Sequence, residues 1–171
     1  MKGKWAAGIP PRNFAWVLPD RLAISERPGG FAPNHRRVRR HEEILWLQSQ
    51  GISQVISLLS SGHNLAAYQE EGLEAHHHPL PSTGDPRGAL AACFADIDAA
   101  LAQGRPVLVH QDELGDRVTG VVAGYLLWSG RLSAALAVAY VERVVGHPMG
   151  APGRELVATA LEMGGRPASA S

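Results

Sequence analysis

The chain has 171 residues, a length that fits one ordinary domain built around one hydrophobic core. Its 16 lysines and arginines balance 16 aspartates and glutamates. This excludes a protein whose net positive charge would attract it to nucleic acid or to an anionic membrane. The single cysteine, Cys93, excludes an intramolecular disulfide and a cysteine-rich zinc site, and this favours a cytoplasmic protein. We expect no membrane span, because no apolar run approaches the roughly 20 residues that one requires.

The first half of the sequence alternates apolar stretches with helical patterns. Pro19-Asp20 is a pair typical of turns, and it splits two short apolar stretches. Asn64 is expected to cap the helix that follows it. The predicted elements of this half are a hairpin over 14–25, a helix over 41–51, a strand over 52–60, a helix over 65–72 and a strand over 73–80.

The second half is mainly helical. Leu90, Phe94, Ile97 and Leu101 recur at helical spacing, and Ser133 is expected to cap a later helix. The predicted elements are a helix over 89–104, a strand over 105–110 and helices over 118–130, 133–146 and 153–164.

Strands that alternate with helices predict the α/β class, with a central, mainly parallel sheet and helices on both faces. We expect residues 1–12 to form an N-terminal lead, residues 13–164 to form a single domain and residues 165–171 to form a disordered tail. In such a sheet, ligands bind beyond the carboxyl end of a central strand.

The stretch VLVHQDELGDRVTG, residues 107–120, joins the most apolar predicted strand to a helix. A turn of this kind directs backbone N–H groups and the positive end of the helix dipole to one point, which favours anion binding. Arg117 would add a planar guanidinium that matches phosphate oxygens.

This stretch resembles the signature of the cysteine-based protein tyrosine phosphatases, which is His-Cys, five residues and Arg. His110, Gln111 and Arg117 fall on the motif positions, with glutamine in place of the cysteine. The segments PPRNFAWVLPDRLA, GISQVISLL, RPVLVH and VVAGYLLWSG resemble the small atypical dual-specificity phosphatases, so that the resemblance runs from about Pro10 to Met163. It implies a protein tyrosine phosphatase-like fold. It also implies a phosphate-loop equivalent made of His110, Gln111, Asp112, Glu113, Leu114, Gly115, Asp116 and Arg117.

The departures from this family pattern point to lost catalysis. The family attacks phosphorus with a thiolate, which the neutral amide of Gln111 cannot replace. Ser82 falls at the position of the general-acid aspartate, with Asp85 three residues further on. Leu114 stands where the family favours glycine, and Val118 where it favours a hydroxyl. We therefore expect no catalytic residues, and predict a pseudophosphatase that acts as a protein-binding or structural subunit for a partner of unknown identity.

Two alternatives stay open. The chain could be an active hydrolase with relocated chemistry, in which Asp112 or Glu113 acts as nucleophile or base. It could instead bind a phosphoprotein or a phosphate through Arg117 without cleaving it. A further hypothesis is that one carboxylate of the loop folds inward and pairs with Arg117.

The run HHH over residues 76–78 raises the question of a metal. Successive strand residues point to opposite faces, so at most His76 and His78 could share an ion, and His110, His63 or Asp85 would have to add a ligand. We predict no metal and no cofactor. The basic stretch over 34–43 reads as a solvated surface, with a binding role as the alternative, and Cys93 is expected to be a small buried residue.

Overall fold

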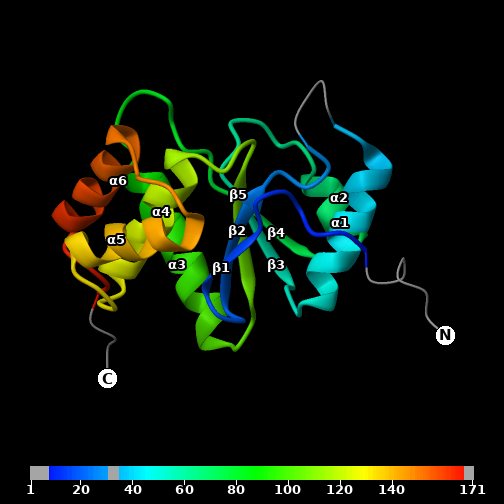
Figure 1. The fold of residues 1–171 in the computed structure, drawn as a ribbon, viewed down its shortest axis with the longest axis horizontal. Coiled ribbons are helices and arrows are strands. Elements are labelled where there is room, and N and C mark those ends of the chain that lie inside the picture. Colours follow the sequence, from blue (N-terminus) through cyan, green and yellow to red (C-terminus); the bar gives the residue numbers. More distant parts are fainter. Residues whose placement is uncertain (1–7, 31–34, 168–171) are drawn as a thin grey trace.

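The computed structural model describes residues 8–30 and 35–167 (Figure 1). Its strands are β1 (Ala15–Leu18), β2 (Leu22–Glu26), β3 (Gln54–Ser57), β4 (Glu74–His77) and β5 (Val107–Gln111). Its helices are α1 (Arg37–Ser49), α2 (Leu65–Glu70), α3 (Arg87–Ala102), α4 (Asp116–Trp128), α5 (Ala134–Val145) and α6 (Ala151–Glu162). The strands form one sheet in the order β1-β2-β5-β3-β4, in which β1 is antiparallel to β2 and the other neighbours are parallel. The predicted α/β class and mainly parallel sheet are confirmed.

The sheet separates two hydrophobic cores because successive strand residues point to opposite faces. In β5, Val107 and Val109 pack into a core with residues of α3, α4, α5 and α6. Leu108, between them, packs into a second core with residues of α1 and α2. Figure 1 shows the four later helices on one side of the sheet and α1 and α2 on the other. β5 lies in the middle of the sheet, so the loop after it leaves from the centre of the molecule.

Helices α4 and α6 approach each other at two glycines. A Cβ atom placed on Gly120 of α4 would lie 2.8 Å from the Cα atom of Gly153 of α6. Asp116, in the first turn of α4, accepts a hydrogen bond of 3.0 Å from the backbone N–H of Gly150, the residue before α6. The two helices therefore meet backbone to backbone, beside the start of α4.

The predicted caps had different outcomes. The Ser133 hydroxyl accepts a hydrogen bond from the Leu136 N–H, as predicted. The cap predicted at Asn64 is wrong, because this side chain makes no cap hydrogen bond to α2. It instead contacts Arg27 and Tyr68, since buried polar groups elsewhere in the fold offer it partners that local sequence cannot reveal.

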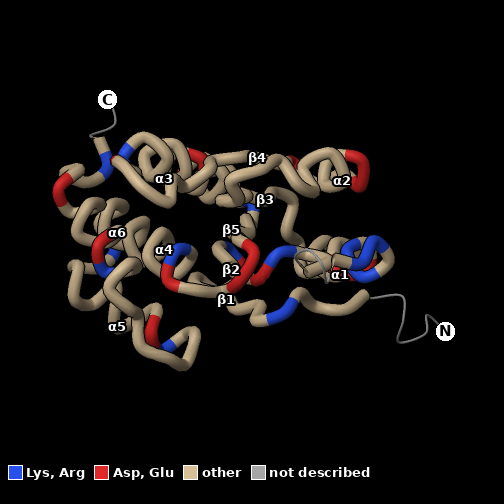
Figure 2. The backbone as a smooth tube through the Cα atoms, turned by 90° about the horizontal axis from the view of Figure 1, so that it is seen from above, with Lys and Arg blue, Asp and Glu red and all other residues tan. Residues whose placement is uncertain are grey.

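The described part of the basic stretch, residues 35–43, runs from just before α1 into the first half of that helix, where Figure 2 shows positive residues gathered. It is partly neutralised internally, because Arg39 pairs with the buried carboxylate of Glu43 at 2.6 Å and His41 contacts Glu71 at 3.1 Å. Residues 1–7 of the predicted lead and 168–171 of the predicted tail lie outside the described residues. Across the described ranges, none of the helices combines the length and the apolar character needed to cross a bilayer.

Candidate functional site

The loop between β5 and α4 is the candidate site. Strand β5 ends at Gln111 and helix α4 begins at Asp116, so the loop consists of residues 112–115 and lies at the carboxyl end of the central strand. Leu114 is partly buried and packs against the first core. Val118 is fully buried in that core, so the residue after Arg117 presents no hydroxyl to the loop. Thr119 is also buried, and its hydroxyl donates to the Gly115 carbonyl within the helix start.

His110 anchors the strand end through a buried polar network. Its Nε2 atom lies 2.9 Å from the Tyr68 hydroxyl of α2, and its Nδ1 atom lies 3.3 Å from the Gln111 carbonyl oxygen. Asn64 donates to the same Tyr68 hydroxyl and accepts from Arg27 of the segment after β2. Burial lowers the pKa of His110 to about 4, so the imidazole is neutral at physiological pH. These hydrogen bonds hold His110 and the end of β5 in place.

The neutral state of His110 makes the fold sensitive to acid. In the unfolded chain this histidine binds a proton near pH 6.5, whereas in the folded chain it does so only near pH 4. The free energy of unfolding is therefore highest above pH 6.5 and decreases as the pH drops toward 4. We expect the free energy of unfolding to fall by roughly 2 kcal/mol between pH 7 and pH 4.5 from this group. Urea unfolding at both pH values checks this: His110→Gln should lose that part of the pH dependence, whereas replacement of the exposed His147 should keep it.

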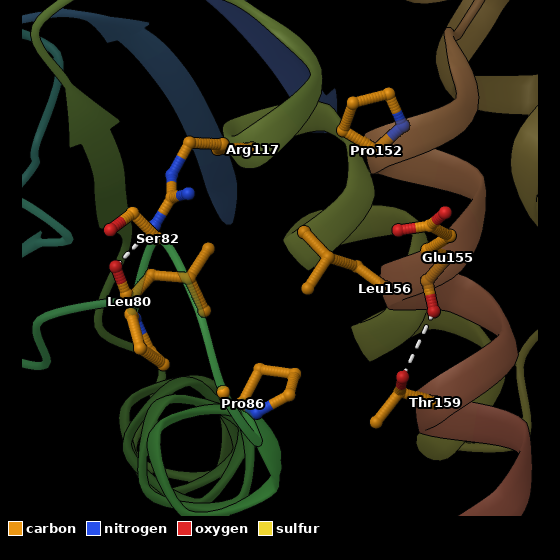
Figure 3. A pocket seen from close by; sticks show the side chains of 10 residues that line it. Leu80, Ser82, Pro86, Arg117, Pro152, Glu155, Leu156 and Thr159 are labelled. Atoms are coloured by element: carbon orange, nitrogen blue, oxygen red, sulfur yellow. Dashed lines mark hydrogen bonds between the residues drawn. The ribbon is translucent and has the colours of Figure 1, made fainter.

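Arg117 extends from the first turn of α4 across the mouth of the loop. One guanidinium nitrogen donates to the Leu80 carbonyl, on the segment between β4 and α3 (Figure 3). Its Nε atom is buried and has no hydrogen-bond partner. No ion pair links Arg117 to an acid of the described residues. This guanidinium therefore keeps donor capacity for a further acceptor.

The loop carboxylates are directed elsewhere. Asp112 lies 3.6 Å from the buried Arg27 guanidinium, and Asp116 accepts from the Gly150 N–H. Glu113 is exposed to solvent. The hypothesis that a loop carboxylate pairs with Arg117 is therefore wrong. The reason is topological: β2 is the neighbour of β5, so the segment after β2 brings a second arginine next to the loop.

Two clefts flank the Arg117 side chain. The first has a volume of about 540 Å³ and lies beside the loop; its lining residues are Leu59, Ser60, Pro79, Leu80, Pro81, Ser82, Thr83, Gln111, Asp112 and Arg117. The second has a volume of about 310 Å³ and is bounded on its far side by α6 residues, among them Glu155 and Thr159 (Figure 3). The structure thus brings Ser82, Gln111 and Arg117 around one cleft, although Ser82 is distant in sequence.

Asp85 does not line either cleft. Its carboxylate accepts from the Arg87 backbone N–H at 3.0 Å and pairs with the Arg87 guanidinium at 3.2 Å. The hydrogen bond from the Arg87 backbone N–H lowers the pKa of Asp85. Desolvation opposes this effect, but the contacts with the Arg87 guanidinium lower the pKa further. This carboxylate belongs to the start of α3 and stays ionised, so it is a poor proton donor.

The thiol of Cys93 offers no alternative nucleophile. Cys93 lies on α3 inside the first core, with 1% of its surface exposed. Burial raises the pKa of this thiol, which keeps it protonated and unreactive. The groups that line the loop cleft can donate and accept hydrogen bonds, but among the described residues they include no thiol.

Sequence reasoning did not identify Arg27, Asn64, Tyr68 or the Leu80 carbonyl as parts of this site. All four come from segments far from residues 110–117 in the chain: Arg27, Tyr68 and the Leu80 carbonyl contact those residues directly, and Asn64 contacts Arg27 and Tyr68. A backbone carbonyl carries no residue-type signal at all. The proximity of Arg27 follows from the pairing of β2 with β5, which the sequence pattern does not specify.

Comparison with known proteins places this fold among phosphatases. No protein-family model matches the chain. A kinase-associated phosphatase, whose catalytic-site cysteine is replaced by serine in the solved structure, aligns with a TM-score of 0.73 and 22% identity over 90% of this chain and 96% of its own. Tk-PTP in its active form aligns with a TM-score of 0.69 and 21% identity over 88% of this chain and 97% of its own.

A third neighbour is the human tyrosine phosphatase-like serine/threonine/tyrosine-interacting protein. It aligns with a TM-score of 0.64 and 17% identity over 88% of this chain and 94% of its own. At these identities, the likeness shows the fold, which is that of dual-specificity and tyrosine phosphatases.

Proposed function

We propose that this chain is a catalytically impaired, phosphatase-like protein, a pseudophosphatase, that acts as a protein-binding or structural subunit. The proposal depends chiefly on Gln111, which ends β5 and lines the loop cleft beside Arg117. By the resemblance of the loop to the phosphatase signature, this is the position of the nucleophilic cysteine. A primary amide is neutral and a very weak nucleophile, so the phosphoenzyme step has no attacking atom.

The surroundings of Gln111 support the same proposal. Ser82 lines the cleft where the family pattern has an aspartic acid, and the nearby Asp85 is bound to Arg87. The buried Val118 cannot assist a leaving thiolate, and the chain's own thiol is enclosed in the core. Each of these replacements removes a different part of one mechanism, so reversing one of them alone would not restore the full rate.

A binding role is favoured by the features of the site that do not depend on the missing catalytic groups. The loop is held by a buried hydrogen-bond network, and it retains a cleft with an arginine across its mouth. One structural neighbour carries a name that describes it as a phosphatase-like interacting protein. We propose a protein partner for this chain on the same basis, with residues 13–164 acting as a single folded domain.

The test is turnover by the purified chain. Incubation with a phosphotyrosine peptide and with an aryl phosphate should release no phosphate above the buffer blank, and Arg117→Ala should leave this result unchanged. Turnover that depends on Arg117 would overturn the proposal.

A second candidate function is the non-hydrolysing recognition of a phosphorylated ligand. It is favoured by Arg117, whose guanidinium contacts a carbonyl and no described carboxylate, so that an incoming dianion could take its free donors. We expect a phosphopeptide to bind the wild-type chain at least tenfold more tightly than it binds Arg117→Met, and the affinity to fall with added salt. Isothermal titration calorimetry measures both. Equal binding of the unphosphorylated peptide would exclude this candidate.

The relocated hydrolase finds less support. Asp112 lines the loop cleft, but its carboxylate lies 3.6 Å from the Arg27 guanidinium, which makes it a weaker nucleophile, and Glu113 is exposed to solvent. This alternative predicts a labile acyl phosphate adduct on one of the two residues. Mass spectrometry after addition of substrate detects such an adduct.

A further inference from the structure

Two histidines near the edge of the sheet meet an aspartate from α3. His76 belongs to β4, and His78 follows directly after that strand. Residues two positions apart in an extended chain point to the same face of the sheet. The rings of His76 and His78 accordingly both turn toward Asp96 of α3. One ring nitrogen of each histidine and one Asp96 oxygen all lie within 4.8 Å of one another. Figure 2 shows β4 and α3 next to each other along the same side of the molecule.

The histidine nitrogens and the carboxylates of this cluster face one another at close range. The Nδ1 atom of His76 lies 2.8 Å from Oδ2 of Asp96, while its Nε2 atom lies 2.8 Å from Oε1 of Glu74. The same Oδ2 atom of Asp96 also contacts Nε2 of His78. One nitrogen of each histidine and an Asp96 oxygen therefore converge on one small region, which is the donor arrangement that a cation requires.

The outer contacts of His76 match those of a metal-binding histidine. A histidine that ligates a metal through one nitrogen usually donates its other N–H to a carboxylate, which fixes the tautomer and the ring orientation. Here Glu74 is in that position, and Arg105 pairs with Glu74 and holds it in place. His76, His78 and Asp96 are partly exposed, with 28%, 19% and 26% of their side chains accessible, so water could reach a bound ion.

We propose that His76, His78 and Asp96 form a Zn²⁺ site that ties β4 to α3. Two imidazoles and one carboxylate suit zinc, which binds such donors at about 2.0–2.2 Å in tetrahedral geometry and here takes water as its fourth ligand. The site rests on a different set of residues from the loop site, and it departs from the sequence-based prediction of no metal. His110, His63 and Asp85, the third ligands weighed from the sequence, take no part in the site.

The position of the site gives the ion a structural consequence. β4 is an edge strand, and the chain runs from His78 directly into the segment that carries Leu80 and Ser82. An ion that fixes His78 to α3 would hold the first residue of that segment, whose Leu80 carbonyl accepts from Arg117. We therefore expect zinc to stabilise the fold and to order this segment, whether or not the chain has a phosphatase-like function.

The experiment is metal titration of the full chain after treatment with a chelator and its removal. Co²⁺ serves as a spectroscopic probe: one equivalent should bind with the visible absorption of a tetrahedral or five-coordinate site, and Zn²⁺ should displace it. Zinc should also raise the midpoint of thermal unfolding. Failure of the wild-type chain to bind either ion stoichiometrically would overturn the proposal.

Variants assign the ligands. Asp96→Asn and His78→Gln should each lower zinc affinity at least tenfold and remove the thermal shift, and Glu74→Gln should lower affinity about tenfold as an outer contact. The matched control is Asp98→Asn, the same substitution on α3 at a carboxylate that pairs with Arg166, and it should bind as the wild type does. His78→Gln keeps the test valid if Asp96→Asn does not fold. Wild-type affinity in both ligand variants would show that the ion binds elsewhere.

Discussion

Replacing Gln111 by cysteine and Ser82 by aspartate in one chain is expected to produce phosphate release that the wild-type chain does not catalyse. Both positions line the same cleft, beside Arg117. The cysteine would sit just before the N-terminus of α4, where the helix dipole and nearby arginines favour a thiolate. The aspartate would supply a general acid, which typically contributes a factor of about 10²–10⁴. The measurement is release of phosphate from an aryl phosphate.

The single variants separate the two contributions. Gln111→Cys alone should turn over at least about a hundredfold more slowly than the double variant, since it lacks the acid. Ser82→Asp alone should be inactive. A double variant with serine at position 111 is the matched control, because its hydroxyl does not ionise in this range, and it should release no phosphate. Because Leu114 and Val118 remain, slow turnover is expected; none at all in the cysteine double variant would contradict the prediction.

Gly120→Ala is expected to lower the free energy of unfolding by about 3 kcal/mol, through overpacking between α4 and α6. The new Cβ would lie 2.8 Å from both the Cα and the carbonyl oxygen of Gly153, and 3.1 Å from Cδ1 of Leu156. Backbone atoms cannot swing aside as a flexible side chain can, so the two helices would have to separate. Urea unfolding of wild type and variant measures the difference.

Two further glycines of the helices calibrate this result. At Gly124, a Cβ would approach ring and methyl atoms of Phe94 and Ala160 at 3.1 Å and 3.2 Å, so alanine there should cost less than it does at Gly120. At Gly88 of α3, nothing lies within 4 Å, and alanine should stabilise the fold by about 0.5 kcal/mol through its better helix propensity. The same loss at Gly88 as at Gly120 would rule out overpacking as the cause.

The architecture could be predicted from the sequence because its signals are local. The helical spacing of Leu90, Phe94, Ile97 and Leu101 predicts α3, and all four are buried as that spacing requires. Helix ends were less exact: α1 begins at Arg37, several residues before the predicted start, because basic residues carry no start signal. The division into lead, domain and tail stays a prediction.

The candidate site was predictable only where it is continuous in the chain. Residues 110–117 lie together because they are one turn between β5 and α4. The partners of that turn depend on which strands are neighbours, so the link from Asp112 to Arg27 could not be foreseen. The same holds for Asp96, since α3 and β4 meet only in the folded chain.

The backbone contact between α4 and α6 has a consequence for recognition. α6 forms the far wall of the smaller cleft beside Arg117, and at Gly120 and Gly153 the backbones of α4 and α6 pack directly against each other. That wall is therefore preorganised relative to the helix that carries Arg117. A ligand or peptide segment that enters this cleft meets a surface whose shape is already fixed. The protein therefore loses little conformational entropy on binding, and shape complementarity determines which ligands bind.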